Sequence, residues 1–339
     1  MKQFFYLLLV TLLIGSCGKD QKKEGKASNS SGFPEVDRIT RLIEKRPQDP
    51  QLHYQRAEAY YNNGLYDLSA KDAQYAIELD STRWEYHHLL ADALLDNARS
   101  KEALNALQYY LEINPKRIPT WLKLAEFQFI LRQYDEAMRS INEIVQIDPQ
   151  EAEAYFMLGK ILEEQGKKEE ALNAYQTAVE MDSRLADAWL SLGNLLIREG
   201  NPQALRYLDN GLAVNPGNTA LMQSKGYALQ ELGRMQEAVN VFDRIIARDP
   251  QNAEAQFNKG VVFLKIDSLE KAEESFRIAQ ELEPANYLFY LNRGFTLEQM
   301  GDYTEALIQY EQANRLSNGK DERVLESIAL IKSKINENK

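Results

Sequence analysis

Small and apolar side chains recur along the chain with a period of 34 residues, beginning near residue 50. The prolines give a check on this period, since Pro115 and Pro149 are 34 positions apart, and so are Pro216 and Pro250. The 67 positions between Pro149 and Pro216 correspond to two periods with one residue lost. Each period holds two stretches of helical length separated by a turn. The pattern therefore predicts a series of helical hairpins.

Aligning the periods produces two columns of small residues, one in each helix of the hairpin. Two helices that cross closely need such positions, because a larger side chain would hold their backbones apart. A third column carries mostly larger side chains, which we expect to fill the space beside the small ones. The first column is Ala57, Ala91, Ala125, Gly159, Gly193, Gly226, Gly260 and Gly294. The second is Ser69, Ala103, Ala137, Ala171, Ala204, Ala238, Ala272 and Ala306. The third is Ala73, Leu107, Ile141, Tyr175, Leu208, Phe242, Phe276 and Tyr310.

The turn inside each hairpin usually carries a glycine, which adopts a left-handed backbone conformation at little cost. These glycines are Gly64, Gly166, Gly200, Gly233 and Gly301. Ala98, Arg132 and Asp267 stand in the same place in three other periods, and the lost residue falls within 200–203. These departures leave the local turn geometry open without changing the predicted fold.

Aromatic residues open several first helices, as Trp121, Tyr155 and Trp189 do. Leucine, glycine, a second aromatic residue, alanine, a third aromatic residue and proline follow in order. This order resembles the tetratricopeptide repeat. The resemblance implies an all-α fold, an α-solenoid of about eight helix-turn-helix repeats that forms a right-handed superhelix with flanking capping helices. The repeats would fill residues 50–320, as 50–83, 84–117, 118–151, 152–185, 186–218, 219–252, 253–286 and 287–320.

A single amphipathic helix is expected on either side of the repeats. Residues 34–49 carry Val36, Ile39, Leu42 and Ile43 at helical spacing, as an amino-terminal capping helix would. Residues 321–339 carry Val324, Ile328, Ile331 and Ile335 on one face, with charged residues on the other. Terminal helices with a polar outer side close the ends of a solenoid.

The first 16 residues have the features of a secretory signal peptide, with Lys2 ahead of an apolar run from Phe4 to Ile14. Ile14, Gly15 and Ser16 precede Cys17, and this order resembles the lipobox of bacterial lipoproteins. Residues 1–16 are thus expected to be a lipoprotein signal peptide and Cys17 the lipidated residue. Cys17 is also the only cysteine in the chain, as suits a protein exported from the cytoplasm. An ordinary signal peptide with an incidental cysteine is the alternative.

Residues 17–33 would then form the lipidated cysteine and a flexible tether, because 18–32 contain no large apolar side chain. The membrane would hold the chain through lipid on Cys17, without a transmembrane helix. Gly18 follows the cysteine where enteric lipoproteins kept in the inner membrane carry aspartate. The expected location is therefore the cell envelope, lipid-anchored in the outer membrane and facing the periplasm, with exposure on the cell surface as the alternative.

The resemblance also implies a concave surface built from the first helices, which holds extended peptides or helices. Its expected character changes along the array, from acidic at the amino end to apolar at the carboxyl end. A ligand would place basic residues against the acids and an apolar segment against the carboxyl end. The alternative is that the acids are a solvated face and the apolar residues pack against neighbouring helices. The candidate groove residues are Tyr54, Glu58, Asp92, Glu126, Phe129, Phe156, Tyr227, Phe257, Val261, Leu264, Leu291 and Phe295.

Composition argues against nucleic-acid binding and catalysis. The net charge of -11 repels phosphates, and no basic stripe with interleaved aromatic residues occurs. Three histidines, no phosphate-binding glycine loop and no paired-ligand motif make an enzyme, a cofactor or a metal site unexpected. His87 and His88 are adjacent, so they diverge by about 100° on a helix.

The sequence therefore predicts a non-enzymatic scaffold or adaptor in the bacterial cell envelope that binds other proteins. A surface-exposed lipoprotein receptor or adhesin for an extracellular protein, peptide or glycan is the alternative. A homodimer formed through the concave face or the terminal helix would cover part of the groove.

Overall fold

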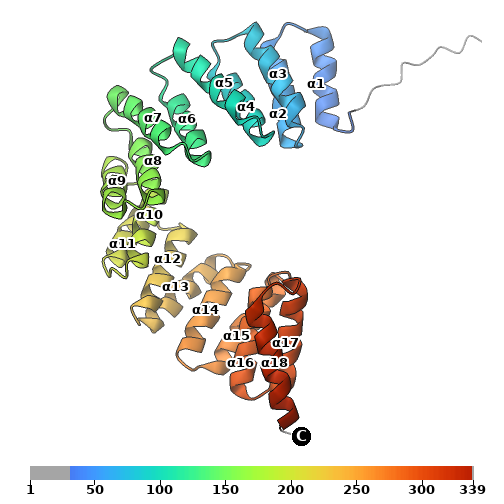
Figure 1. Cartoon of the computed structure of the whole chain (residues 1–339), viewed down its shortest axis with the longest axis vertical. Coiled ribbons are helices and arrows are strands. Elements are labelled where there is room, and N and C mark those ends of the chain that lie inside the picture. The colour runs from blue at the N-terminus through green and yellow to red at the C-terminus, as the bar shows by residue number, and fades with distance from the viewer. Residues whose placement is uncertain (1–30, 338–339) are drawn as a thin grey trace, which may run out of the picture. The chain divides into compact units, whose positions relative to one another are not determined.

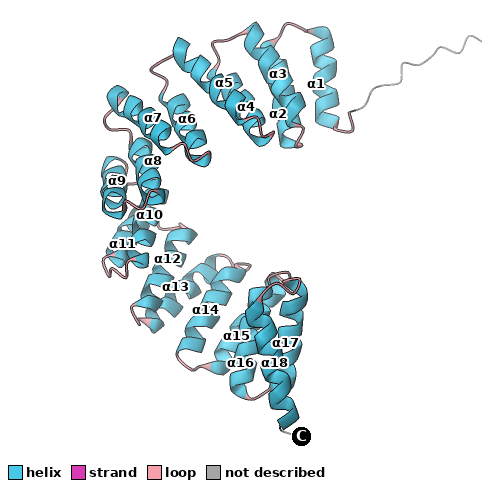
Figure 2. Cartoon of the chain, in the orientation of Figure 1, coloured by secondary structure: helices cyan, strands magenta, loops and turns pink. Residues whose placement is uncertain are grey.

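The computed structural model describes residues 31–337. Across these residues the secondary structure is helical, without strands, and short loops join the helices (Figure 2). This confirms the all-α fold and the α-solenoid class. The helices are α1 (Pro34–Lys45), α2 (Pro50–Asn62), α3 (Tyr66–Leu79), α4 (Trp84–Asp96), α5 (Ser100–Ile113), α6 (Ile118–Ile130), α7 (Tyr134–Ile147), α8 (Ala152–Glu164), α9 (Lys168–Met181), α10 (Ala186–Arg198), α11 (Ala204–Val214), α12 (Thr219–Glu231), α13 (Met235–Arg248), α14 (Ala253–Lys265), α15 (Leu269–Leu282), α16 (Tyr287–Met300), α17 (Tyr303–Leu316) and α18 (Glu322–Glu337).

The chain forms two compact units that meet within α4, after Leu89. In the first unit α1 packs on α2, and α2 packs on α3. In the second unit the helices pair as hairpins, α6 with α7 and α8 with α9, and so on to α16 with α17 (Figure 1). Each second helix also packs on the first helix of the following hairpin, as α7 does on α8. First helices of neighbouring hairpins touch as well, among them α6 and α8.

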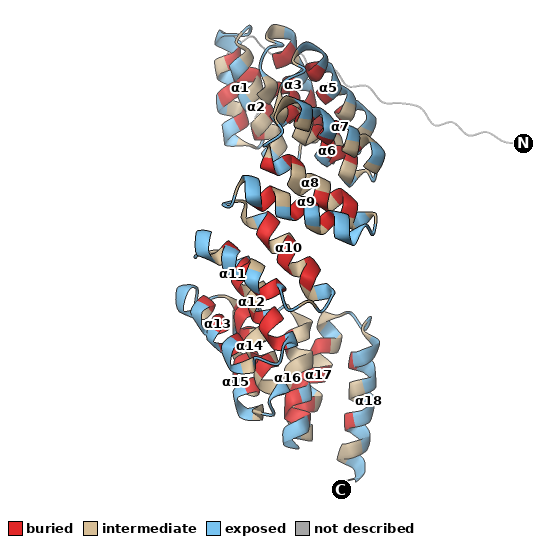
Figure 3. Cartoon of the chain, turned by 90° about the vertical axis from the view of Figure 1, so that its left-hand side faces the viewer, coloured by how far each residue is buried: buried red, intermediate tan, exposed pale blue. Residues whose placement is uncertain are grey.

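The predicted columns meet inside the hairpins whose first helix carries a glycine. A Cβ added to Gly159 would overlap the ring of Tyr175, and a Cβ on Gly226 would overlap the ring of Phe242. The larger residues of the third column are almost completely buried, Tyr175 at 1% exposure and Phe242 at 0%. In Figure 3 the buried residues lie on the helix faces that are turned toward neighbouring helices. The large side chain of the second helix thus fills the space that the small residue of the first helix leaves open.

Two of these buried tyrosines also hold a carboxylate. The Tyr175 hydroxyl donates to Glu163 over 2.7 Å, and the Tyr310 hydroxyl donates to Glu298 over 2.7 Å. Burial, and then the hydrogen bond to the carboxylate, raise the pKa of both tyrosines. Lys334 of α18 donates to the other oxygen of Glu298, also over 2.7 Å. The last helix is therefore tied to the buried end of α16.

Residues that open the first helices bind the turn that precedes them. A ring N–H or hydroxyl donates to a backbone carbonyl six residues earlier, which fixes the chain where it enters the next helix. The pairs are His53 with Pro47, His87 with Ser81, Trp121 with Pro115, Tyr155 with Pro149 and Trp189 with Ser183, at 2.8 to 3.1 Å. In the α12 hairpin, Arg248 binds the Pro216 carbonyl over 2.7 Å instead. The histidines at 53 and 87 thus share a structural role with tryptophan and tyrosine.

The turns without glycine keep the glycine conformation. Ala98 and Arg132 both have a φ of 58°, and Asp267 has a φ of 57°. The left-handed conformation costs roughly 1 kcal/mol per non-glycine residue, which the packing of the two flanking helices offsets. The lost residue shortens α11, which begins at Ala204 and has 11 residues where α13 has 14.

The flanking helices bury one face each. Val36, Ile39 and Ile43 of α1 are buried in a cluster with Leu52 of α2. Val324 and Ile331 of α18 are 0% exposed, and α18 packs on α17.

We expect Gly159→Ala to destabilise the α8 hairpin. Alanine gains roughly 1 kcal/mol of helix propensity over glycine, but its Cβ would overlap the Tyr175 ring, and such overpacking costs about 1–3 kcal/mol. The net change should lower the midpoint of urea unfolding followed by circular dichroism. Gly217→Ala is the control, since its Cβ would meet nothing nearer than 3.7 Å. A stabilised Gly159→Ala would show that the space beside Gly159 is open.

We expect Lys334→Met to loosen α18, because it leaves the Glu298 carboxylate, buried at 8% exposure, with Tyr310 but without its cation. Amide hydrogen exchange in α18 should become faster. Lys332→Met is the matched control, because Lys332 also lies on α18 but pairs with Glu311 of α17, whose side chain is 43% exposed. Equal exchange rates in the two variants would contradict this role for Glu298.

Candidate binding surface on the first helices

Helix periodicity places one residue of each first helix directly after the small column, on the side away from the second helix. These residues form what we call the first-helix row. In the second compact unit the row is Asp92, Glu126, Lys160, Asn194, Tyr227, Val261 and Phe295. Glu58 holds the same position in the first compact unit.

In the first compact unit, two groove candidates interact with each other. The Tyr54 hydroxyl forms a hydrogen bond with Glu58. The pKa of Tyr54 is raised, chiefly by burial and then by this hydrogen bond. The Tyr54 ring lies 5.0 Å from that of Tyr86. Both candidates are half-buried, so the hydroxyl of Tyr54 and the carboxylate of Glu58 remain partly accessible beside the tyrosine rings.

The acidic end of the second unit is partly neutralised. Lys123 of α6 pairs with Asp92 of α4 over 2.8 Å. The pKa of Asp92 is raised, mainly by burial. The ion pair with Lys123 lowers this pKa, and the negative charges of Asp96 and Glu126 raise it further. Glu126 itself is exposed. The surface here is therefore acidic, with Glu126 as its most accessible carboxylate among the groove candidates.

The middle of the row is a lysine between two aromatic rings. The Lys160 ammonium lies 5.0 Å from the centre of the Phe129 ring and 5.8 Å from that of Phe156. Phe129 belongs to α6 and Phe156 to α8, so the rings come from adjacent repeats. Phe156 also packs against the buried Tyr175, at 5.9 Å between ring centres.

At the apolar end, candidates divide between the surface and the core. Tyr227 is 51% exposed and Phe295 is 44% exposed. Val261, Leu264 and Leu291 are half-buried. Phe257 lies 5.5 Å from Phe276 and 5.0 Å from Phe289, so it packs within and between hairpins rather than standing free. Tyr227 and Phe295 are therefore the apolar residues here that are most available to a partner.

Ion pairs between hairpins were missed by the sequence reasoning. Lys225 pairs with Asp209 over 2.6 Å, and Lys259 pairs with Asp243 over 2.7 Å. Each lysine stands directly before the small column and each acid 16 residues earlier. That recurring distance is the signal that could have identified them. Arg293, in the same column, reaches Glu273 over 2.7 Å.

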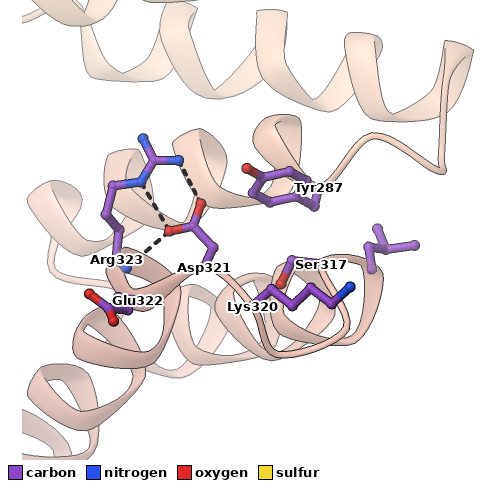
Figure 4. Close-up of a pocket in the computed structure, with 7 residues that line it drawn as sticks. Tyr287, Ser317, Lys320, Asp321, Glu322 and Arg323 are labelled. Atoms are coloured by element: carbon purple, nitrogen blue, oxygen red, sulfur yellow. Dashed lines mark hydrogen bonds and ion pairs between the residues drawn. The ribbon is translucent and has the colours of Figure 1, made fainter.

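A shallow surface hollow of about 620 Å³ lies where α17 ends and α18 begins (Figure 4). Arg323 and Asp321 form an ion pair there at 2.5 Å, and the Asp321 carboxylate also accepts the backbone N–H of Arg323. The Arg323 guanidinium lowers the pKa of Asp321 to about 2. Tyr287 faces this pair from α16. The charges are satisfied locally, so we interpret the pair as the start of α18.

Residues 31–337 contain no group of three or more histidine, cysteine, aspartate or glutamate residues placed to hold a metal ion. None of the helices in this range is long and apolar enough to cross a membrane. Cys17 lies outside the described residues.

Family comparisons agree with the helical hairpins. Models described as "Tetratricopeptide repeat" match residues 36–83, 94–161, 199–253, 223–286 and 287–319, and one described as "TPR repeat" matches 164–200. Human tetratricopeptide repeat protein 6 is 31% identical over 115 residues, which are 34% of this chain and 22% of that protein. The chain thus matches about a fifth of the length of this relative.

Two solved structures share the fold. A tetratricopeptide repeat protein from Parabacteroides merdae aligns with a TM-score of 0.53 and 17% identity over 73% of this chain and 98% of that one. The Cut9–Hcn1 hetero-tetramer of the APC/C aligns with a TM-score of 0.52 and 16% identity, over 87% of this chain and 58% of that one. With the family matches along most of its length and the packing of its hairpins, this chain belongs to the tetratricopeptide repeat family.

Proposed function

We propose that the chain is a lipid-anchored scaffold of the bacterial cell envelope that holds an extended or helical segment of a partner protein on its first-helix row. The tetratricopeptide fold generally serves as a non-enzymatic scaffold for protein–protein interaction. The envelope location and the use of this row are our proposals.

The observation that carries the proposal is the pair of exposed aromatic residues at one repeat position. Tyr227 and Phe295 occupy the same place on α12 and α16, with Val261 of α14 between them in the row. Neighbouring first helices touch, α12 with α14 and α14 with α16. Aromatic side chains that are half exposed in the free protein are frequent centres of binding energy. An apolar segment of a partner that follows the row would cover both.

The acidic end of the row supports a partner with basic residues. Glu126 is exposed, and the Asp92 carboxylate pairs with Lys123 while two acids, Asp96 and Glu126, lie near it. Complementary charge favours encounter and fixes the register of a bound segment more than it adds affinity.

The membrane anchor rests on the sequence. The apolar run from Phe4 to Ile14 and the small residues before Cys17 support export and lipidation. Each buried methylene of an acyl chain adds about 0.8 kcal/mol to membrane binding, so several chains would hold the protein firmly. Gly18 after the cysteine favours the outer membrane, facing the periplasm.

We expect Tyr227→Ala/Phe295→Ala to release the partner without unfolding the protein. The test crosslinks the chain in its native membrane and identifies the proteins that co-purify with wild type and with the variant. Removing two exposed anchors should lower partner recovery at least tenfold, since such anchors contribute about 1–2 kcal/mol each or more.

The matched control is Ile308→Ala, since Ile308 is 50% exposed on α17, a second helix. Phe257 is unsuitable for this test because it packs against Phe276 and Phe289. Equal recovery of the same partners from wild type and the double variant would rule out the apolar end of the row as their binding site.

We expect Cys17→Ser to move the protein from the carbonate-washed membrane to the soluble fraction and to abolish incorporation of a clickable fatty acid. Ser28→Ala, within the predicted tether, should change neither. Retention of Cys17→Ser on washed membranes would contradict lipid anchoring. Protease added to intact cells separates the two orientations, because a periplasmic scaffold is shielded and a surface receptor is cut.

A further inference from the structure

The cations of the first helices are ion-paired, with one exception. The paired residues are Arg56 with Asp72, Lys123 with Asp92, Arg198 with Glu163, Lys225 with Asp209, Lys259 with Asp243, Lys265 with Glu231 and Arg293 with Glu273. Lys160 of α8 has no carboxylate within ion-pair distance in the part of the chain that the structure describes. The protein has a net charge of -11, so a cation of the proposed binding surface that lacks a carboxylate partner differs from the other cations of the first helices.

The surroundings of Lys160 explain its position. Its ammonium faces the rings of Phe129 and Phe156, which attract a cation through the negative charge of their faces. The lysine is half-buried, so the rings replace part of its water shell. Two rings from adjacent repeats therefore hold the ammonium in place before any ligand arrives, which lowers the entropy cost of binding an anion there.

We propose that Lys160 receives a side-chain carboxylate of the bound partner, with Phe129 and Phe156 forming the apolar walls of this subsite. This inference rests on the proposed function, since it assigns one residue of the partner segment to one position of the row. A carboxylate bound to an ammonium gains a charge-assisted hydrogen bond, and the rings beside it limit the water that would screen the pair.

The single cation decides which anion fits. A phosphate group carries close to two negative charges and three acceptor oxygens, and it is usually bound by several arginines or lysines. Lys160 is one point charge, and the neighbouring Lys123 is already paired with Asp92. One aspartate or glutamate side chain matches this capacity.

The row also sets the spacing within the partner. Glu126 precedes Lys160 by one repeat, and the two first helices that carry them, α6 and α8, are in contact. Packed helices lie about 8–10 Å apart, and a chain in the extended polyproline II conformation rises about 3.1 Å per residue with three residues per turn, so side chains three positions apart lie on the same side. An extended segment that follows the row would therefore carry a basic residue over Glu126 about three positions from the acidic residue over Lys160.

The test is a selection of phage-displayed random linear 12-residue peptides on the full-length chain in detergent, in parallel for wild type and Lys160→Glu. We expect wild-type binders to share an aspartate or glutamate about three positions from a lysine or arginine. Binders of Lys160→Glu should lose the acidic position. In fluorescence anisotropy with a synthetic wild-type binder, Lys160→Met should weaken affinity about tenfold, and replacing the peptide's acid by glutamine should cost little further affinity in that variant.

Lys271→Glu is the matched control. Lys271 lies on α15, a second helix, and its ammonium is 5.5 Å from the centre of the Phe263 ring of α14. It should select the same peptides as wild type. An identical acidic preference in wild type and Lys160→Glu binders would overturn the Lys160 subsite while leaving binding on the row intact. Absence of specific binders from both would instead count against the proposed function. A phosphoserine peptide that binds over tenfold tighter than its glutamate counterpart would overturn the carboxylate assignment.

Discussion

The close crossing of the two helices in each hairpin is the constraint on which the rest of the structure depends. A glycine or alanine on the first helix lets the backbones approach, and a large side chain from the second helix, such as Tyr175 beside Gly159, fills the space. Where the second helix supplies a ring, as Tyr175, Phe242 and Phe276 do, backbone lies against a rigid side chain, and the fit tolerates little change in volume. Each hairpin thereby has a fixed face toward its neighbours and a fixed face toward solvent.

Fixing those faces also determines the electrostatics of the surface. Lysines that stand directly before the small column point at the preceding second helix, where Asp209 and Asp243 meet them. Such half-exposed pairs add little stability individually, but they cancel the charge of cations that would otherwise face a ligand. At the same position in α8 the residue is Leu158. Lys160, which pairs with no carboxylate of the described residues, lies two positions later on the first-helix row. The charge that a partner meets is therefore set by which helix face each lysine occupies.

Aromatic residues have three different roles in the repeats of this chain. Trp121, Tyr155 and Trp189 bind the carbonyl of the preceding turn, and Tyr175 and Tyr310 hold buried carboxylates. Tyr227 and Phe295 remain half exposed on the first-helix row. Helix position alone separates these tasks, since the residue types overlap. A 34-residue repeat can thus combine a buried core with exposed aromatic side chains on its first helix.

By itself the sequence determined the helical class, the repeat length and the residues that pack inside each hairpin, because these depend on a local pattern repeated along the chain. It also determined the candidates for the row, through their offset from the small column. Only the tertiary structure decided that Phe257 packs against Phe276 and Phe289 while Phe295 stays exposed, and that Lys160 lies between Phe129 and Phe156 without an ion pair to any residue of 31–337. Those outcomes depend on side chains from neighbouring repeats, whose approach the spacing within one repeat does not specify. The backbone of Ala98, Arg132 and Asp267 was likewise decided by the tertiary structure. The helices that these residues join impose the left-handed conformation, which the residue types themselves disfavour.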